Sequence, residues 1–413
     1  MTQSPQLSRK LRTPDAVIIG LGSMMGAGLF AAFTPAAQAA GNALLVGLVV
    51  AAIVAFCNAT STAQLAASYP NAGGVYLYGR ERLGEFWGFL AGWSFVIGKT
   101  ASCAAMALTF AAYAAPTGWE RPVAALAVAA LAAVNYFGVT RTALVTRVIV
   151  ALVLIALAIG VASAVSGADA PDPDFTLVGT GWHGILQSAG LLFFAFAGYA
   201  RVATMGEEVV DPARTIPRAI TIALAITVSV YGVVAVALLG TLGAAGIAAT
   251  PTPLADAAGA GGWAFAGPVV RVGAALAALG ALLGLIAGIG RTGFAMAREG
   301  DLPRWLAAVH PKFHTPHRAE VAVAAVIVVL VLTIDLRGAI GFSSFGVLLY
   351  YSVANVAALT QPSAQRRYWR ALQIVGLAGC LVLVATLPSP SIVVGVGVLV
   401  IGVGYRALAR AQR

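Results

Sequence analysis

The sequence predicts an all-α membrane protein with twelve transmembrane helices, and three observations support this fold class. Of the 413 residues, 60% are hydrophobic and 10% are charged, with a mean hydropathy of +0.90, whereas soluble globular proteins carry about 25% charged residues. Apolar segments long enough to span a bilayer occur twelve times. The loops that join these segments are alternately rich and poor in basic residues. The expected spans are residues 15–36, 42–66, 87–114, 121–138, 143–165, 184–206, 218–240, 264–294, 319–335, 338–359, 369–387 and 390–408.

The distribution of basic residues predicts the orientation. If the N-terminus is cytoplasmic, the outer loops receive only Arg121, Arg271 and Arg337, and Lys99 and Arg201 lie within spans. The other twenty of the 25 Lys and Arg residues then lie at cytoplasmic ends and loops. This bias predicts a multi-pass protein of the cytoplasmic (inner) membrane with both termini cytoplasmic. It accounts for the net charge of +10 without a nucleic-acid partner. The polar, basic residues 1–13 form the expected cytoplasmic tail, with no cleavable signal peptide.

Glycine marks two weak points in the expected helices. It occupies four of eleven positions in GLGSMMGAGLF at residues 20–30, and it costs a helix about 0.5–1 kcal/mol per residue relative to alanine. A second interruption is expected near Gly198. The alternative is that these glycines are packing contacts between helices. Interruptions five spans apart predict two inverted five-helix repeats, about 14–165 and 184–359, which form a ten-helix transport core over residues 14–359. Residues 360–413 hold helices eleven and twelve, expected to serve packing or dimerisation, and a short cytoplasmic tail.

Four motifs together identify a resemblance. They are GLGSMMGAGLF at 20–30, QLAASYPNAGGVYLY at 64–78, FFAFAGY at 193–199 continuing into EEVVDPARTIPRAI at 207–220, and RTGFAMAREGDLP at 291–303 followed by TPHRA at 315–319. In this order the motifs resemble those of the amino acid–polyamine–organocation (APC) superfamily, within the bacterial amino acid permeases, from about residue 10 to residue 360. The resemblance implies a transporter whose helices 1 and 6 are broken at the substrate site.

An amino acid substrate would suit such breaks. Bare N–H groups at a half-helix N-terminus suit a carboxylate, and bare C=O groups at a half-helix C-terminus suit an ammonium. By resemblance, the backbone from Met24 to Gly28 takes the carboxylate, carbonyls near Met24, Phe194 and Ala197 take the ammonium, and Phe194 closes over the substrate. Ordinary core packing is the alternative for the aromatic residues. The expected substrate-binding residues are Ser23, Met24, Gly26, Ala27, Gly28, Phe194, Ala197, Gly198 and Lys99.

Lys99 lies deep in the third expected span, too far from either end to reach water easily. Three roles stay open: proton coupling, selection of acidic substrates, and a structural contact with helix-end carbonyls. Many proton-coupled relatives carry a lysine on span five, eighteen residues after the position of Asn135, where this chain has Val153. Lys99 is therefore the candidate proton carrier, unless the protein exchanges substrates and needs no proton site.

The end of the sixth span carries charges of both signs. Arg201 follows the expected break, where relatives often place an acid at the position of Ala200, and it is expected to be structural or to pair with a nearby glutamate. With Lys99, Arg201 argues against cationic substrates. A cytoplasmic gate is expected where mixed charges meet the basic loops at 80–82 and 291–318, with a solvated helix end as the alternative. Its residues are Glu207, Glu208, Asp211, Arg214 and Arg218.

Other chemistries find little support. No P-loop, Rossmann fingerprint or nucleophile elbow occurs, so we expect no ATP-driven pump, no enzyme and no cofactor. His310, His314 and His317 have a spacing that could bind zinc, but they lie in a loop with two prolines, and we expect no metal site. Three cysteines without disulfide or zinc spacing are expected to be packing residues. They are Cys57, Cys103 and Cys380.

These observations favour a secondary active transporter for a zwitterionic amino acid, with neutral or acidic side chains preferred to cationic ones. Its expected partners are a small-molecule amino acid, protons and the lipid bilayer. Proton symport is preferred to exchange, and the oligomeric state is left open. The alternatives are an exchanger of amino acids or amines without proton coupling, a transporter-like amino acid sensor, and a channel. The sensor lacks a signalling domain, and the channel lacks a continuous polar file.

Overall fold

A computed structural model describes residues 11–69, 73–138, 143–167 and 181–411, and these residues form helices without any strand. The only sheet-like pairing among them is an isolated bridge between Leu11 and Val209. The first half contains α1 (Thr13–Met24), α2 (Ala27–Ala31), α3 (Phe33–Ala40), η1 (Gly41–Ala43), α4 (Leu44–Ser68), α5 (Gly74–Leu83), α6 (Glu85–Ala114), α7 (Glu120–Tyr136) and α8 (Ala143–Ser166). The second half contains α9 (Trp182–Phe196), η2 (Ala197–Tyr199), α10 (Ala200–Ala203), α11 (Pro212–Ala249), α12 (Pro253–Ala260), α13 (Ala266–Arg298), η3 (Arg304–Ala307), α14 (His317–Thr333), α15 (Leu336–Leu359), η4 (Ser363–Gln365), α16 (Arg370–Thr386) and α17 (Ser389–Ala411).

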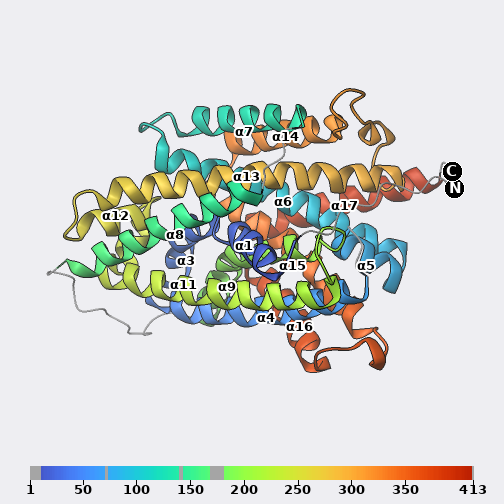
Figure 1. Cartoon of the computed structure of the whole chain (residues 1–413), viewed down its shortest axis with the longest axis horizontal. Helices are drawn as coiled ribbons and strands as arrows, with labels where there is room; N and C mark the ends of the chain where they lie inside the picture. Colours follow the sequence, from blue (N-terminus) through green and yellow to red (C-terminus); the bar gives the residue numbers. More distant parts are fainter. Residues whose placement is uncertain (1–10, 70–72, 139–142, 168–180, 412–413) are drawn as a thin grey trace.

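The long helices run side by side along the longest axis of the molecule. Figure 1 shows α7 and α14 paired at one edge, with α4 and α16 at the opposite edge. Within the described residues, nine helical segments are long and apolar enough to cross a membrane. The expected all-helical membrane architecture is therefore confirmed. The count of twelve spans stays a prediction, because α7, α14 and α16 have 17 residues each.

Helix boundaries differ from the expected spans where the sequence is less apolar. The first span continues through α3 to Ala40, and Gly41, with φ of 52°, ends it. The seventh span is longer at both ends, since α11 covers 38 residues with a non-helical Gly243 inside it. Two helices were not expected at all. They are α5, which carries charged residues, and the short α12 between α11 and α13.

Small residues allow the central helices to pack closely. Helix α6 packs against both α13 and α15. A Cβ atom placed on Gly98 of α6 would lie 3.0 Å from the Cα atom of Gly346 in α15, so larger residues would force these helices apart. One turn further along, the hydroxyls of Ser102 and Ser343 lie 2.6 Å apart and are both buried.

The C-terminal helices α16 and α17 dock on the rest of the bundle. Asn355 Nδ2 of α15 donates to Asn58 Oδ1 of α4 at 2.6 Å, and Asn58 Nδ2 donates to Cys380 Sγ of α16 at 3.2 Å. Trp93 Nε1 of α6 donates to the carbonyl of Val398 in α17 at 3.0 Å. The packing role expected for these helices thus has specific polar contacts, and dimerisation stays a prediction. All three cysteines are buried and free.

Candidate functional site

The glycine-rich stretch in the first span interrupts the helix. Helix α1 ends at Met24, and α2 begins at Ala27. Between them Met25 (φ −81°, ψ 32°) and Gly26 (φ −82°, ψ −147°) leave the helical conformation. The cause is local, because three glycines within seven residues weaken the helix where the chain turns.

The interruption in the sixth span is gentler than the sequence suggests. Helix α9 ends at Phe196, and Ala197–Tyr199 form the 3₁₀ turn η2 before α10 resumes the same course. The backbone is tightened here rather than unwound, with Ala197 at φ −66° and ψ 3°. A 3₁₀ turn inside a helix often marks a functional hinge.

The two interruptions lie against each other. A Cβ atom on Gly28 would lie 2.5 Å from the Cα atom of Ala195 in α9, and one on Gly198 would lie 2.6 Å from the backbone nitrogen of Met24. Gly26 faces α13 instead, where a Cβ atom would lie 2.8 Å from that of Ala281. Only glycine fits these three positions without movement of the neighbouring backbone or side chain.

The structure brings all the expected substrate-binding residues into this region. Ser23 and Gly198 are partly exposed, and the others are buried, including Met24, Ala27 and Phe194. Ser23 Oγ donates to the carbonyl of Ile19 at 2.9 Å, so its hydroxyl is engaged within its own helix.

Lys99 reaches the second interruption from α6. Its side chain is 7% exposed, and Nζ donates to the carbonyl oxygen of Ala197 at 3.2 Å. Tyr351 Oη of α15 donates to the same oxygen at 3.4 Å and stacks on Tyr199 with ring centroids 5.0 Å apart. A contact with a helix-end carbonyl was one of the three roles left open for this lysine, and the structure shows such a contact at Ala197, the residue that follows α9.

Tyr231 of α11 is a site residue that the sequence analysis missed. Its hydroxyl lies 2.6 Å from the carbonyl oxygen of Met24 and 3.0 Å from that of Ala195, and it has one proton to share between them. It therefore links the two interrupted helices. The available signal was a single tyrosine in an apolar span, because a buried phenol usually finds a hydrogen-bond partner.

The carbonyls that the resemblance assigns to an ammonium already have donors from the protein. The carbonyl of Met24 accepts from the hydroxyl of Tyr231. The carbonyl of Ala197 accepts from Lys99 and from Tyr351. The carbonyl of Phe194 accepts from the N–H of Ala197. A cation supplied by the protein itself thus occupies part of the candidate site.

The expected gate residues lie at the end of the bundle where Leu11 and Arg410 lie, called here the terminal end. Asp211 has φ of 47° and precedes α11, and Arg214 pairs with it at 3.8 Å while both side chains are exposed. The carbonyl of Glu208 accepts from the N–H of Leu11 at 3.1 Å. Glu207 is partly exposed, and Arg218 is exposed. The cluster therefore contacts the start of α1.

Arg80, which was expected to meet this cluster, binds elsewhere. Its guanidinium pairs with Asp301 at 3.1 Å and with Glu299 at 3.3 Å. Arg82 instead bonds to Thr360. In this conformation neither Arg80 nor Arg82 pairs with a residue of the expected gate at 207–218.

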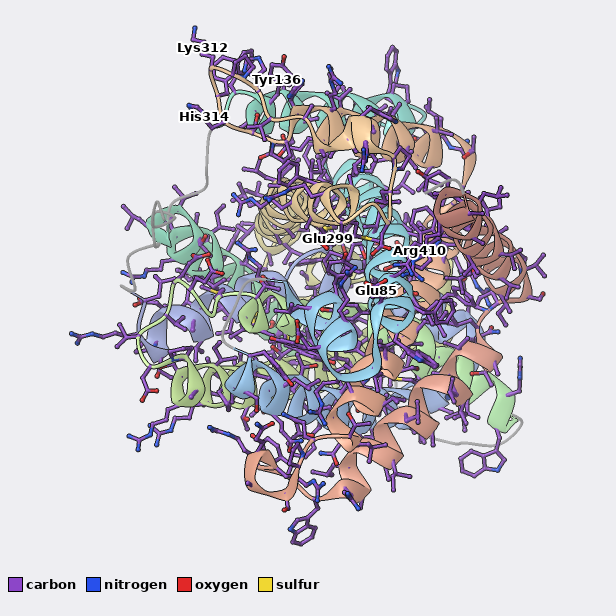
Figure 2. All side chains as sticks on the ribbon, turned by 90° about the vertical axis from the view of Figure 1, so that its right-hand side faces the viewer. Glu85, Tyr136, Glu299, Lys312, His314 and Arg410 are labelled. Carbon is purple, nitrogen blue, oxygen red and sulfur yellow. The ribbon has the colours of Figure 1, made fainter. Side chains whose placement is uncertain are left out.

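Asp301 is the centre of a buried ionic cluster that the sequence analysis did not identify as such. Its carboxylate, 1% exposed, accepts from Tyr76 Oη at 3.0 Å, Arg80 at 3.1 Å and Arg406 Nε at 2.9 Å. Burial raises the pKa of Tyr76, and the Asp301 charge raises it further. Glu85 adds ion pairs with Arg80 and Arg406, so the cluster joins α5, α6, α17 and the segment after α13. Figure 2 shows Glu85, Glu299 and Arg410 gathered at this end.

Arg201 does not form a buried ion pair. Its side chain on α10 is exposed, and Glu208 and Arg291 are the charged residues that interact with it electrostatically. On α13, positions Gly284 and Gly288 have open space where a Cβ atom would point, and they precede Arg291 at helical spacing. Arg201 and Arg291 are thus exposed basic residues close enough for their charges to interact.

The loop histidines pack against aromatic rings. His310 and His317 have ring centroids 5.3 Å and 6.0 Å from Tyr136 of α7, and His310 Nδ1 accepts from the N–H of Lys312. Figure 2 shows Tyr136, Lys312 and His314 in one corner of the molecule. The described residues contain no group of three His, Cys, Asp or Glu side chains that could hold a metal ion.

Comparison with known proteins extends over the whole bundle. A family model described as Amino acid permease matches residues 11–405. An uncharacterized transporter of Mycobacterium tuberculosis is 56% identical over 407 residues, covering 98% of this chain and 92% of that protein. A branched-chain amino acid permease of Bacillus subtilis is 27% identical over 394 residues, covering 90% and 84%. A chloroplastic protein of Arabidopsis thaliana, cationic amino acid transporter 7, is 28% identical over 379 residues, covering 85% and 65%.

Proposed function

Because the chain belongs to the amino acid permease family of the APC superfamily, we propose that it is a secondary active transporter for a zwitterionic amino acid. It moves this substrate across the cytoplasmic membrane by alternating access, coupled to protons. No cofactor and no catalytic step are needed for this function.

The proposed architecture has twelve spans with both termini in the cytoplasm. Helices α7, α14 and α16 supply the three short spans, since 17 residues lie at the lower limit of about 17–25 residues for a spanning helix. Residues 14–165 and 184–359 form the two inverted repeats of the ten-helix core, and residues 360–413 hold the last two spans and the tail. The terminal end is then the cytoplasmic end.

One observation carries the proposal: interruptions in two helices, far apart in the chain, lie against each other in the interior. Gly28 abuts Ala195, and Gly198 abuts the backbone of Met24. Backbone that leaves the helix at membrane depth survives where it is buried in protein or lines a cavity. The substrate carboxylate then binds the N–H groups between Met24 and Gly28, and Phe194 covers it.

The substrate class follows from the charges around this region. Lys99 contacts the second interruption, and Arg201, which follows it on α10, interacts electrostatically with Arg291. A cationic side chain would be repelled by these groups, so neutral and acidic amino acids are preferred. Of the similar proteins, the branched-chain amino acid permease fits this preference better than the cationic amino acid transporter.

Coupling and gating use different residues. Lys99 is the proposed proton carrier, and the mixed charges at 207–218 form a gate that rearranges as the terminal end opens. Exchange without protons is the second candidate function. It is favoured by Val153, which is buried at the span-five position where many proton-coupled relatives carry a lysine.

A thermal-shift screen of the purified protein against the standard amino acids and common amines tests the proposal. A ligand at about 100 times its Kd stabilises the native state by about 2.7 kcal/mol, so a true substrate raises the unfolding temperature. We expect stabilisation by neutral or acidic amino acids and none by arginine or polyamines. Stabilisation by cationic amines alone, or by none of these compounds, would contradict the proposal.

A further inference from the structure

The hydrogen bonds around the second interruption show that the carbonyl of Ala197, which the resemblance assigns to the substrate's ammonium, is already fully engaged. The carbonyl oxygen of Ala197 has two lone pairs. Lys99 Nζ takes one at 3.2 Å, and Tyr351 Oη takes the other at 3.4 Å. A substrate ammonium that approached this oxygen would find no free acceptor site.

The nearby carbonyls are also engaged, each by one donor from the protein, whereas Ala197 has both of its lone pairs occupied. Met24 and Ala195 share the hydroxyl of Tyr231, and Phe194 accepts from the N–H of Ala197. Lys99 therefore stands where a substrate ammonium would stand, as a primary ammonium on a side chain long enough to leave.

Lys99 is also held by few interactions. Its partner is a neutral carbonyl, and no carboxylate of the described residues pairs with it. The titratable groups beside it are Cys103 on its own helix and the phenol of Tyr351 on α15, which shares its carbonyl acceptor, and both are uncharged at neutral pH. The nearest charged side chain along the chain beyond Ala197 is that of Arg201, which points to exposed space.

We infer that Lys99 is a tethered competitor for the substrate's ammonium, so that an amino acid and a protonated Lys99 cannot occupy the site together. This inference rests on the proposed function and adds that proton binding to Lys99 and amino acid binding oppose each other. Two ammonium groups on one carbonyl in a desolvated site repel each other. Binding of the amino acid therefore displaces the Lys99 side chain and releases its proton. A carrier that holds either a proton or an amino acid moves the two in opposite directions, rather than by the symport that the sequence favoured.

The test measures amino acid affinity in three versions of the protein: wild type, Lys99→Met and Lys99→Arg. The panel of standard amino acids is applied to each at about pH 6 and about pH 8. In the wild type, the affinity for the amino acid should increase by up to about tenfold for each unit by which the pH is raised, because Lys99 then loses its proton. Lys99→Met should bind at least about tenfold more tightly than the wild type at the lower pH and lose the pH dependence. Lys99→Arg, which keeps a cation that cannot titrate, should bind weakly at both pH values.

A second measurement uses the wild type alone, so it stands even if Lys99→Met fails to fold. Calorimetric titration of the amino acid that binds best, in two buffers of different ionisation enthalpy, counts the protons released. About one proton should leave per amino acid bound in the range where the affinity depends on pH.

The outcomes separate the inference from the proposed function. Amino acid binding with no proton release, or a Lys99→Met variant that binds more weakly than the wild type, would overturn the competitor role and leave the transporter proposal intact. Binding of none of the amino acids to the wild type or to the folded Lys99→Met variant would overturn both.

Discussion

Replacing Gly28 with alanine tests the contact between the two interrupted helices with the smallest possible change. The added Cβ atom would lie 2.5 Å from the Cα atom and 2.8 Å from the Cβ atom of Ala195, whereas ordinary contacts begin at 3.4 Å. Helices α2 and α9 must then separate by about 0.9 Å, and overpacking of this kind costs about 1–3 kcal/mol. At a functional site, a misplacement of about 1 Å reduces activity by about 100-fold.

We therefore expect Gly28→Ala to reduce amino acid uptake by about 10- to 100-fold while the protein still folds. The assay is uptake by reconstituted vesicles, with folding checked by gel filtration and thermal unfolding in detergent. The matched control is Gly232→Ala in α11, where a Cβ atom meets nothing within 4 Å and where alanine favours the helix. Uptake by Gly28→Ala equal to that of Gly232→Ala would refute the reasoning.

Three further substitutions test other parts of the structure. Asp301→Asn leaves Arg406 without its buried counter-charge and should destabilise the protein by about 3–5 kcal/mol in thermal unfolding. The control Glu299→Gln changes an exposed pair and should cost less than about 1 kcal/mol. Equal effects of the two substitutions would contradict the buried cluster. Tyr231→Phe removes the donor shared by two carbonyls and should lower stability by about 1–3 kcal/mol, and an unchanged unfolding temperature would count against that link. Glu208→Lys should slow turnover at least about tenfold while amino acid affinity changes less than about threefold, and parallel losses would argue against a gate.

The helices could be predicted from the sequence because a span is a local property. Each expected range coincides with one helix or, for the first and sixth ranges, with one interrupted series of helices. The errors lie at the ends, because α11 extends beyond its expected range on both sides and Gly41 ends α3 beyond the expected boundary of the first span. Helices α5 and α12 were missed because their own sequences do not indicate a span. They are too short, or in the case of α5 too polar, to give a membrane signal, and contacts with other helices fix them.

Only the local features of the candidate site could be predicted from the sequence, namely the glycine-rich interruption and the buried lysine. The stretch at 20–30 indicated its own interruption, and the lysine at position 99 indicated its own burial. Neither pattern could reveal the partner of Lys99, because the carbonyl of Ala197 lies 98 positions away. The Tyr231 hydroxyl and the Asp301 cluster were missed on the same grounds, since their partners lie 207 and 105 positions away, at Met24 and Arg406.

The paired interruptions at Gly28 and Gly198 are the proposed amino acid site of a transporter. Counterflow tests it most directly, because exchange of labelled for unlabelled amino acid needs no assumption about the driving ion. Vesicles containing the protein are loaded with one unlabelled amino acid from the panel, and uptake of the same labelled compound is followed. We expect rapid counterflow of at least one neutral or acidic amino acid by the wild type, and counterflow that is about 10- to 100-fold slower in Gly28→Ala. No counterflow by folded wild-type protein with any amino acid, or equal counterflow by Gly28→Ala, would contradict the proposed site.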